Sequence, residues 1–103
     1  MQSDKQFIRY VILQGFPESL VIKKRLEGEI LVVMSSELVL EFLNPVAKDF
    51  FLLIDGKKTL RTIVEDLTRT YDADASTIES DIVELVRELQ RKRILRINSE
   101  PNV

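Results

Sequence analysis

The spacing of apolar positions along the chain changes near Asn44. Before that residue, apolar side chains come in short runs rich in Val, Ile and Leu, a pattern typical of β-strands. After it, they recur every three or four residues, as they do on the buried face of a helix. The pattern predicts an α+β chain in which a small sheet precedes a group of helices.

Four segments in the first part have the composition of strands, at residues 7–13, 20–26, 30–35 and 38–43. Gly28 can take the positive φ that a tight turn requires, so 20–26 and 30–35 are predicted to form a hairpin. Residues 38–43 are expected to continue it as a third antiparallel strand. The apolar segment 7–13 is predicted to be an extra strand or an arm.

The first residues of three helices can be recognised in the second part. Asn44 is a preferred N-cap, and Pro45 suits the first helical position because its missing N–H would be unpaired there anyway. Thr59 can cap a second helix, and Ser76 with Glu79 forms a capping box for a third. Each start is followed by an apolar stripe: Ala47, Phe50, Phe51 and Ile54; Leu60, Ile63, Val64 and Leu67; Ile78, Ile82, Leu85, Val86 and Leu89.

The predicted order of elements is that of a winged helix-turn-helix: a three-stranded antiparallel sheet followed by three helices. We expect the 103 residues to form a single domain, because one core typically takes about 100–150 residues. Within it, residues 1–19 are an N-terminal extension or extra strand. Residues 20–97 are the winged helix-turn-helix, and residues 98–103 are a frayed tail.

The composition excludes several kinds of chemistry. Neither Cys nor His is present, which removes thiolate chemistry, the commonest general base and the commonest metal ligand. We therefore predict a protein that is not an enzyme and has no catalytic residue, no metal site and no cofactor. The apolar runs are too short to span a bilayer, and the polar start lacks the pattern of a signal peptide. This predicts a cytoplasmic protein without membrane contact.

A series of short motifs in this chain resembles the signature of a known family. The motifs are LNPVA at 43–47, LIDG at 53–56, TLRTIV at 59–64, YDAD at 71–74 and DI at 81–82. In this order they resemble the PqqD-like family: pyrroloquinoline quinone synthesis protein D and the precursor-peptide recognition elements of ribosomally made peptides. The resemblance covers about residues 21–97. The family usually has a Gly-Leu pair where this chain has Arg93-Ile94, so the end of the third helix is less sharply defined.

The resemblance implies a fold, a function and partners. Members are winged helix-turn-helix proteins that bind the leader segment of a precursor peptide and deliver it to a modifying enzyme, often a radical SAM maturase. The leader adds as a strand beside the third strand and lies against the third helix, a mode in which backbone groups give affinity and side-chain pockets give specificity. Mapped onto this sequence, the predicted peptide-binding residues are Leu38, Val39, Leu40, Glu41, Phe42, Glu79, Val83 and Val86.

Two other functions stay open at this stage. A winged helix-turn-helix can be a DNA-binding regulator that reads the major groove with its last helix. Here that helix begins with Glu79, Asp81 and Glu84 and the net charge is −2, so we expect no nucleic-acid partner. A homodimeric adaptor without a peptide ligand is the other alternative, because the apolar segment 7–13 can pair with the sheet of a second copy.

Overall fold

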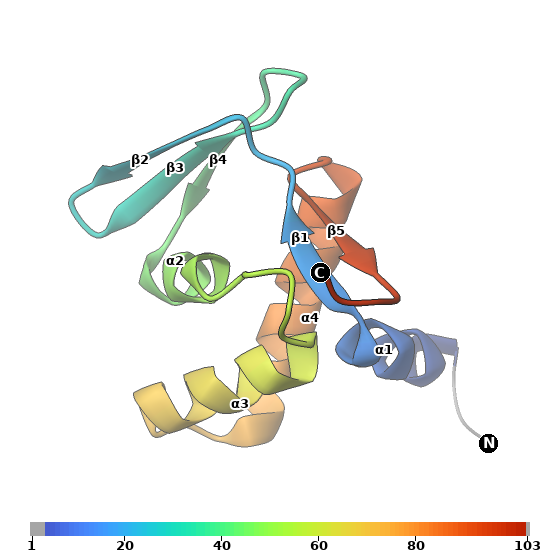
Figure 1. The fold of residues 1–103 in the computed structure, drawn as a ribbon. Coiled ribbons are helices and arrows are strands. Elements are labelled where there is room, and N and C mark those ends of the chain that lie inside the picture. Colours follow the sequence, from blue (N-terminus) through green and yellow to red (C-terminus); the bar gives the residue numbers. More distant parts are fainter. Residues whose placement is uncertain (1–3, 103) are drawn as a thin grey trace.

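The computed structural model describes residues 4–102. Strands β2, β3 and β4 form an antiparallel sheet in that order, and the helices α2, α3 and α4 follow it along the chain. The predicted α+β arrangement, a three-stranded antiparallel sheet followed by three helices, is confirmed. The elements are α1 (Asp4–Gln14), β1 (Phe16–Ser19), β2 (Lys23–Glu27), β3 (Ile30–Met34), β4 (Leu40–Leu43), α2 (Pro45–Leu52), α3 (Leu60–Tyr71), α4 (Ala75–Arg91) and β5 (Leu95–Asn98) (Figure 1).

The three-stranded sheet is a meander with one buried face. The β2–β3 turn passes through Gly28 with φ 61°, as predicted for a tight turn. Leu31 and Val33 of β3 belong to the core, whereas Val32 and Met34 on the other face are only half-buried. This alternation follows from the pleat of a strand, in which successive side chains point to opposite faces.

The helix starts are fixed by side-chain caps, two of which the sequence predicts. The side chain of Asn44 accepts a hydrogen bond from the backbone N–H of Ala47 (2.9 Å), and Thr59 caps α3. For α4, the prediction of a capping box at Ser76 is wrong, because the N-cap is Asp74. Its carboxylate accepts from the backbone N–H of Thr77 (3.1 Å) and from the hydroxyl of Ser76 (2.6 Å), so Ser76 supports the cap instead of forming it.

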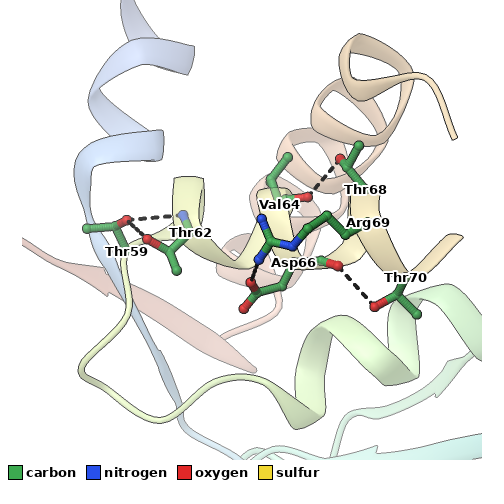
Figure 2. Close-up of polar contacts among 7 residues, drawn as sticks. All are labelled: Thr59, Thr62, Val64, Asp66, Thr68, Arg69 and Thr70. Atoms are coloured by element: carbon green, nitrogen blue, oxygen red, sulfur yellow. Dashed lines mark hydrogen bonds and ion pairs between the residues drawn. The ribbon is translucent and has the colours of Figure 1, made fainter. Parts of the chain in front are cut away.

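The polar side chains of α3 bond within their own helix (Figure 2). Thr59 Oγ1 accepts from the Thr62 N–H (3.2 Å), and Thr68 Oγ1 donates to the Val64 carbonyl (2.8 Å). The carboxylate of Asp66 forms an ion pair with Arg69, and the backbone carbonyl of Asp66 accepts a hydrogen bond from the Thr70 hydroxyl. These contacts stabilise the helix locally.

The prediction of a strand or arm at residues 7–13 is wrong, because this segment lies in the helix α1. The residues that α1 buries are Ile12 and Leu13, with Arg9 half-buried one turn earlier. A spacing of three and four residues is typical of a helix. The strand was predicted from the apolar content of residues 7–13 alone. Helix α1 lies beside α3 and α4, far from the three-stranded sheet (Figure 1).

A second, two-stranded sheet joins β1 to β5. The pairing is antiparallel, with Phe16 opposite Asn98 and Ser19 opposite Leu95. Both strands lie outside the three-stranded sheet that the sequence predicts. Beyond β5, the backbone N–H of Asn102 donates to the carbonyl of Gly56 (2.8 Å), where a frayed tail was expected. Val103 lies outside the described residues.

Helix α4 runs through the middle of the molecule and contacts α1, α2, α3 and β5. Its residues Ile78, Ile82, Val86 and Leu89 are buried. Since α4 is covered from several sides, each side of the helix has a different neighbour, and this determines which of its residues remain accessible.

Candidate functional site

Strand β4 has one free edge. Within the described residues it pairs only with β3, so the backbone groups along its other edge have no strand partner. Such an edge is a ready template for a further strand. The free edge faces the C-terminal end of α4 (Figure 1). Just past that end, Lys92 reaches across to Glu41 of β4.

A groove of about 390 Å³ continues from the end of β4 between α2 and α4. Its apolar surface includes Val46 and Leu85, which are partly exposed and pack on the core. The groove therefore offers apolar contact next to a strand edge that can bind backbone. Its lining consists of Asn44, Val46 and Ala47 at the start of α2 and of Ile78, Asp81, Ile82, Glu84, Leu85 and Glu88 on α4.

The groove is acidic along its α4 wall. Asp81, Glu84 and Glu88 line it, and no Lys or Arg does. At the end near β4, the ammonium of Lys92 lies 3.1 Å from a carboxylate oxygen of Glu88 and within 3.0 Å of both oxygens of Glu41. Hydrogen bonds to Glu41 first, and then to Glu88, raise the pKa of Lys92 above its ordinary value.

The strand residues predicted to bind peptide divide between two faces and a turn. Leu38 lies in the turn before β4 with a φ of 64°, and Val39 follows it, also exposed. Leu40 and Phe42 are exposed on the sheet face turned away from α2. Glu41 points the other way and bonds Lys92. The backbone edge of β4 is available, but only Glu41 among these side chains faces the α4 side.

The helix residues predicted to bind peptide lie on the far side of α4. Val86 is fully buried, and Val83 is 8% exposed beside α1. Glu79 makes ion pairs with Arg9 of α1 (3.4 Å) and Arg61 of α3 (3.8 Å). Because residues on a helix advance by about 100° each, these three positions lie roughly opposite Lys92. The structure therefore does not bring Glu79, Val83 and Val86 together with β4.

On the side toward the groove and β4 lie Asp81, Leu85 and Glu88 of α4 and, just past its end, Lys92, at spacings of four, three and four residues. From the sequence, Leu85 was expected in the apolar core stripe of the helix, and Asp81, Glu88 and Lys92 were not among the residues predicted to bind peptide. The information that identifies the accessible side of α4 lies in residues 7–13. This segment is part of the helix α1, and α1 covers the side of α4 that carries Glu79 and Val83. The side available to a ligand is then the opposite one.

Two further findings limit the chemistry of the described residues. No cluster of acidic side chains among residues 4–102 is arranged to hold a metal ion. Within the same range, every helix is too short or too polar to cross a membrane.

Known proteins resemble this chain in sequence and in fold. A family model described as coenzyme PQQ synthesis protein D (PqqD) matches residues 31–95. Proteins named PqqA binding protein are 39% identical in Xanthomonas oryzae pv. oryzae (strain PXO99A) and in Xanthomonas campestris pv. campestris (strain B100). Each match spans 66 residues, 64% of this chain and 71% of the relative. The chain therefore belongs to the PqqD family, as its motifs indicated.

A solved structure has the same fold. It is described as TbiB1 in complex with the TbiA(beta) leader peptide and superposes with a TM-score of 0.68. The superposition covers 79% of this chain and 94% of TbiB1, at 21% sequence identity. At that identity the likeness concerns the fold, which is the winged helix-turn-helix predicted from the order of strands and helices.

Proposed function

We propose that this protein binds the leader segment of a ribosomally made precursor peptide and presents it to a modifying enzyme, without catalysing a reaction itself. The observation that carries the proposal is the free edge of β4 beside the groove between α2 and α4. Family membership supports it, as do the names of the relatives, which bind PqqA, and of TbiB1, which was solved with a leader peptide. The proposed place of action is the cytoplasm, where ribosomes release precursor peptides.

The leader adds as a strand along β4 and its side chains select the partner. Backbone pairing with the edge is nearly independent of sequence, so the groove supplies the specificity. An apolar leader side chain packs on Val46 and Leu85, and burying it contributes about 1.5–3 kcal/mol. A Lys or Arg of the leader meets Asp81 and Glu84, for which no ion pair is recorded among residues 4–102, and Glu88, which already shares the ammonium of Lys92.

The placement of Glu79 weakens the DNA-binding alternative. In that alternative the first turns of α4 would contact phosphates. Here Arg9 and Arg61 both form ion pairs with Glu79, so these two cations are already paired with a carboxylate. Asp81 and Glu84 are exposed. A phosphate backbone approaching this end of α4 meets uncompensated carboxylates.

The test is a titration of isotope-labelled protein with the leader segment of the precursor peptide encoded beside it. We expect saturable amide shifts at residues 40–43 of β4 and at the Asp81–Leu85–Glu88 side of α4. The variant Leu85→Glu is expected to weaken the leader affinity by about tenfold or more, because it puts a charge into the apolar contact.

The matched control is Leu52→Glu, which changes an exposed Leu of α2 that is not in the groove lining. It should keep the wild-type affinity. Shifts confined to α1, or an equal loss of affinity in both variants, would contradict the proposed site. Absence of binding at high peptide excess would contradict the function.

A further inference from the structure

The sheet face turned away from α2, here called the outer face, is a second apolar surface. Alternate residues of the three strands form it: Lys23, Arg25 and Glu27 of β2, Ile30, Val32 and Met34 of β3, and Leu40 and Phe42 of β4. Leu40 is 52% exposed and Phe42 is 67% exposed, so no element of the described chain covers them. Helix α2 lies on the opposite side of the sheet, and the other helices lie beyond it (Figure 1).

The outer face is hollowed and its rim is basic. The hollow measures about 490 Å³ and has Val32, Met34, Leu40 and Phe42 in its lining. Along β2, the hollow is bordered by three cations and one acid: Lys23, Lys24, Arg25 and Glu27. Arg25 pairs with Glu27 (2.7 Å), whereas no ion pair is recorded for Lys23 or Lys24 among residues 4–102. An apolar centre with cations along one side calls for a ligand with the opposite charge at its border.

We propose that the outer face is a second docking surface, which binds an apolar patch flanked by Asp or Glu side chains on a partner protein. The proposal rests on the proposed function in one respect: the partner is the enzyme that modifies the peptide held on β4. Both ligands can bind together, because a peptide strand lies in the plane of the sheet at its β4 edge and the partner packs on the face of the sheet.

A second copy of this chain fits the outer face less well. Face-to-face pairing of two copies opposes apolar side chains and cations, and the one carboxylate in the lining of the hollow, Glu27, is already paired with Arg25. Pairing through the β2 edges brings Lys23, Lys24 and Arg25 of both copies together, and Lys on an edge strand is a known barrier to such pairing. The charges therefore favour a different, acidic protein.

The experiment measures two affinities on the full chain. One is for the leader peptide, and the other is for the purified modifying enzyme encoded beside the chain, with the leader present at saturation. The variants are Met34→Thr, which keeps a strand-forming residue on β3, and the double change Lys23→Glu with Arg25→Glu. Lys57→Glu with Lys58→Glu is the control, since it makes the same change in net charge in the connection between α2 and α3.

We expect both outer-face variants to bind the enzyme about tenfold more weakly or worse, with leader affinity unchanged and thermal stability near that of the wild type. The control should bind both ligands normally, and enzyme binding by the wild type should weaken as salt rises. Normal enzyme binding by the outer-face variants, or no binding of the enzyme by the wild type, would overturn the proposal. A wild-type dimer that Met34→Thr dissociates would overturn it in favour of a second copy. If the wild type does not bind the leader peptide, that result would instead overturn the proposed function.

Discussion

The ammonium of Lys92 lies 2.9 and 3.0 Å from the two carboxylate oxygens of Glu41. The two residues are 51 positions apart, and their contact joins the end of α4 to β4. Because a second carboxylate, that of Glu88, shares the same ammonium, the contact is a small network and not a single exposed pair. It fixes one end of the groove beside the free strand edge.

The Lys92–Glu41 contact should make part of the stability depend on alkaline pH. The pKa of Lys92 is raised above 10.5 in the folded protein, mainly by hydrogen bonding to Glu41. Its contribution is therefore fully present below 10.5 and is lost as pH rises through the folded-state pKa. We expect wild type to be more stable than Glu41→Gln near neutral pH, and the difference to shrink above pH 10.5. Urea unfolding of both proteins across this range measures it, and a difference that stays constant would contradict the assignment.

The acidic wall of the groove should select the charge of the leader. Replacing Glu84 and Glu88 by Lys is expected to weaken binding of a leader with a Lys or Arg in the groove by about tenfold, because attraction becomes repulsion. The same variant should bind more tightly a leader in which that residue is changed to Glu. Calorimetric titration of the four combinations gives the coupling energy. An equal loss of affinity for both leaders would mean that the variant is damaged and that the groove does not select the leader by its charge.

The turn before β4 contains a strained residue. Leu38 has φ 64°, a conformation that costs a residue with a branched side chain roughly 1–2 kcal/mol, and it is 70% exposed. Asn tolerates this conformation, so Leu38→Asn should raise the free energy of unfolding by about 0.5–1 kcal/mol. The control is Leu40→Asn, in an ordinary strand conformation, which should lower it. Denaturant unfolding compares the three proteins, and a destabilised Leu38→Asn would show that the side chain has packing that outweighs the strain.

The phenol of Tyr71, at the end of α3, donates a hydrogen bond to the carboxylate of Asp49 in α2. This bond is the main reason that the pKa of Tyr71 is raised above 10.0, so the contact stabilises the fold below that pH and is lost as pH rises through the folded-state pKa. In a Tyr10→Phe background, the absorbance of the phenolate reports Tyr71 alone, because the chain has two Tyr residues. Asp49→Asn should lower its titration midpoint. An unchanged midpoint would mean that the two side chains do not meet in solution.

The sequence predicted the elements whose signals are local. The hairpin at Gly28, the caps at Asn44 and Thr59 and the apolar stripes each depend on residues within one or two turns of one another. The error at α1 came from a segment whose apolar residues are too many to show a clear period: Phe7, Tyr10 and Val11 are exposed in the helix. Composition then suggested a strand, although the buried positions follow helical spacing.

The strand edge and the helix wall of the candidate site depend on different kinds of information. The strand at residues 38–43 is a local feature, and its free edge follows from the order of the meander. The accessible side of α4 depends on which neighbours cover the helix, and α1 covers the side of Glu79 and Val83. Because residues 7–13 were predicted as a strand or arm, their contact with α4 was not foreseen, and the covered side of α4 was predicted to bind the peptide.

The small sheet of β1 and β5 joins segments on either side of residues 31–95, which the family model matches. A chain cut to those residues loses β2 completely and retains only Leu95 of β5. Strand β3, which has no charged residue, then becomes an edge of the sheet. The segment before residue 31 thus gives the sheet two unlike edges: β2 carries Lys23 and Lys24, which disfavour pairing with a further strand, and β4 carries no lysine.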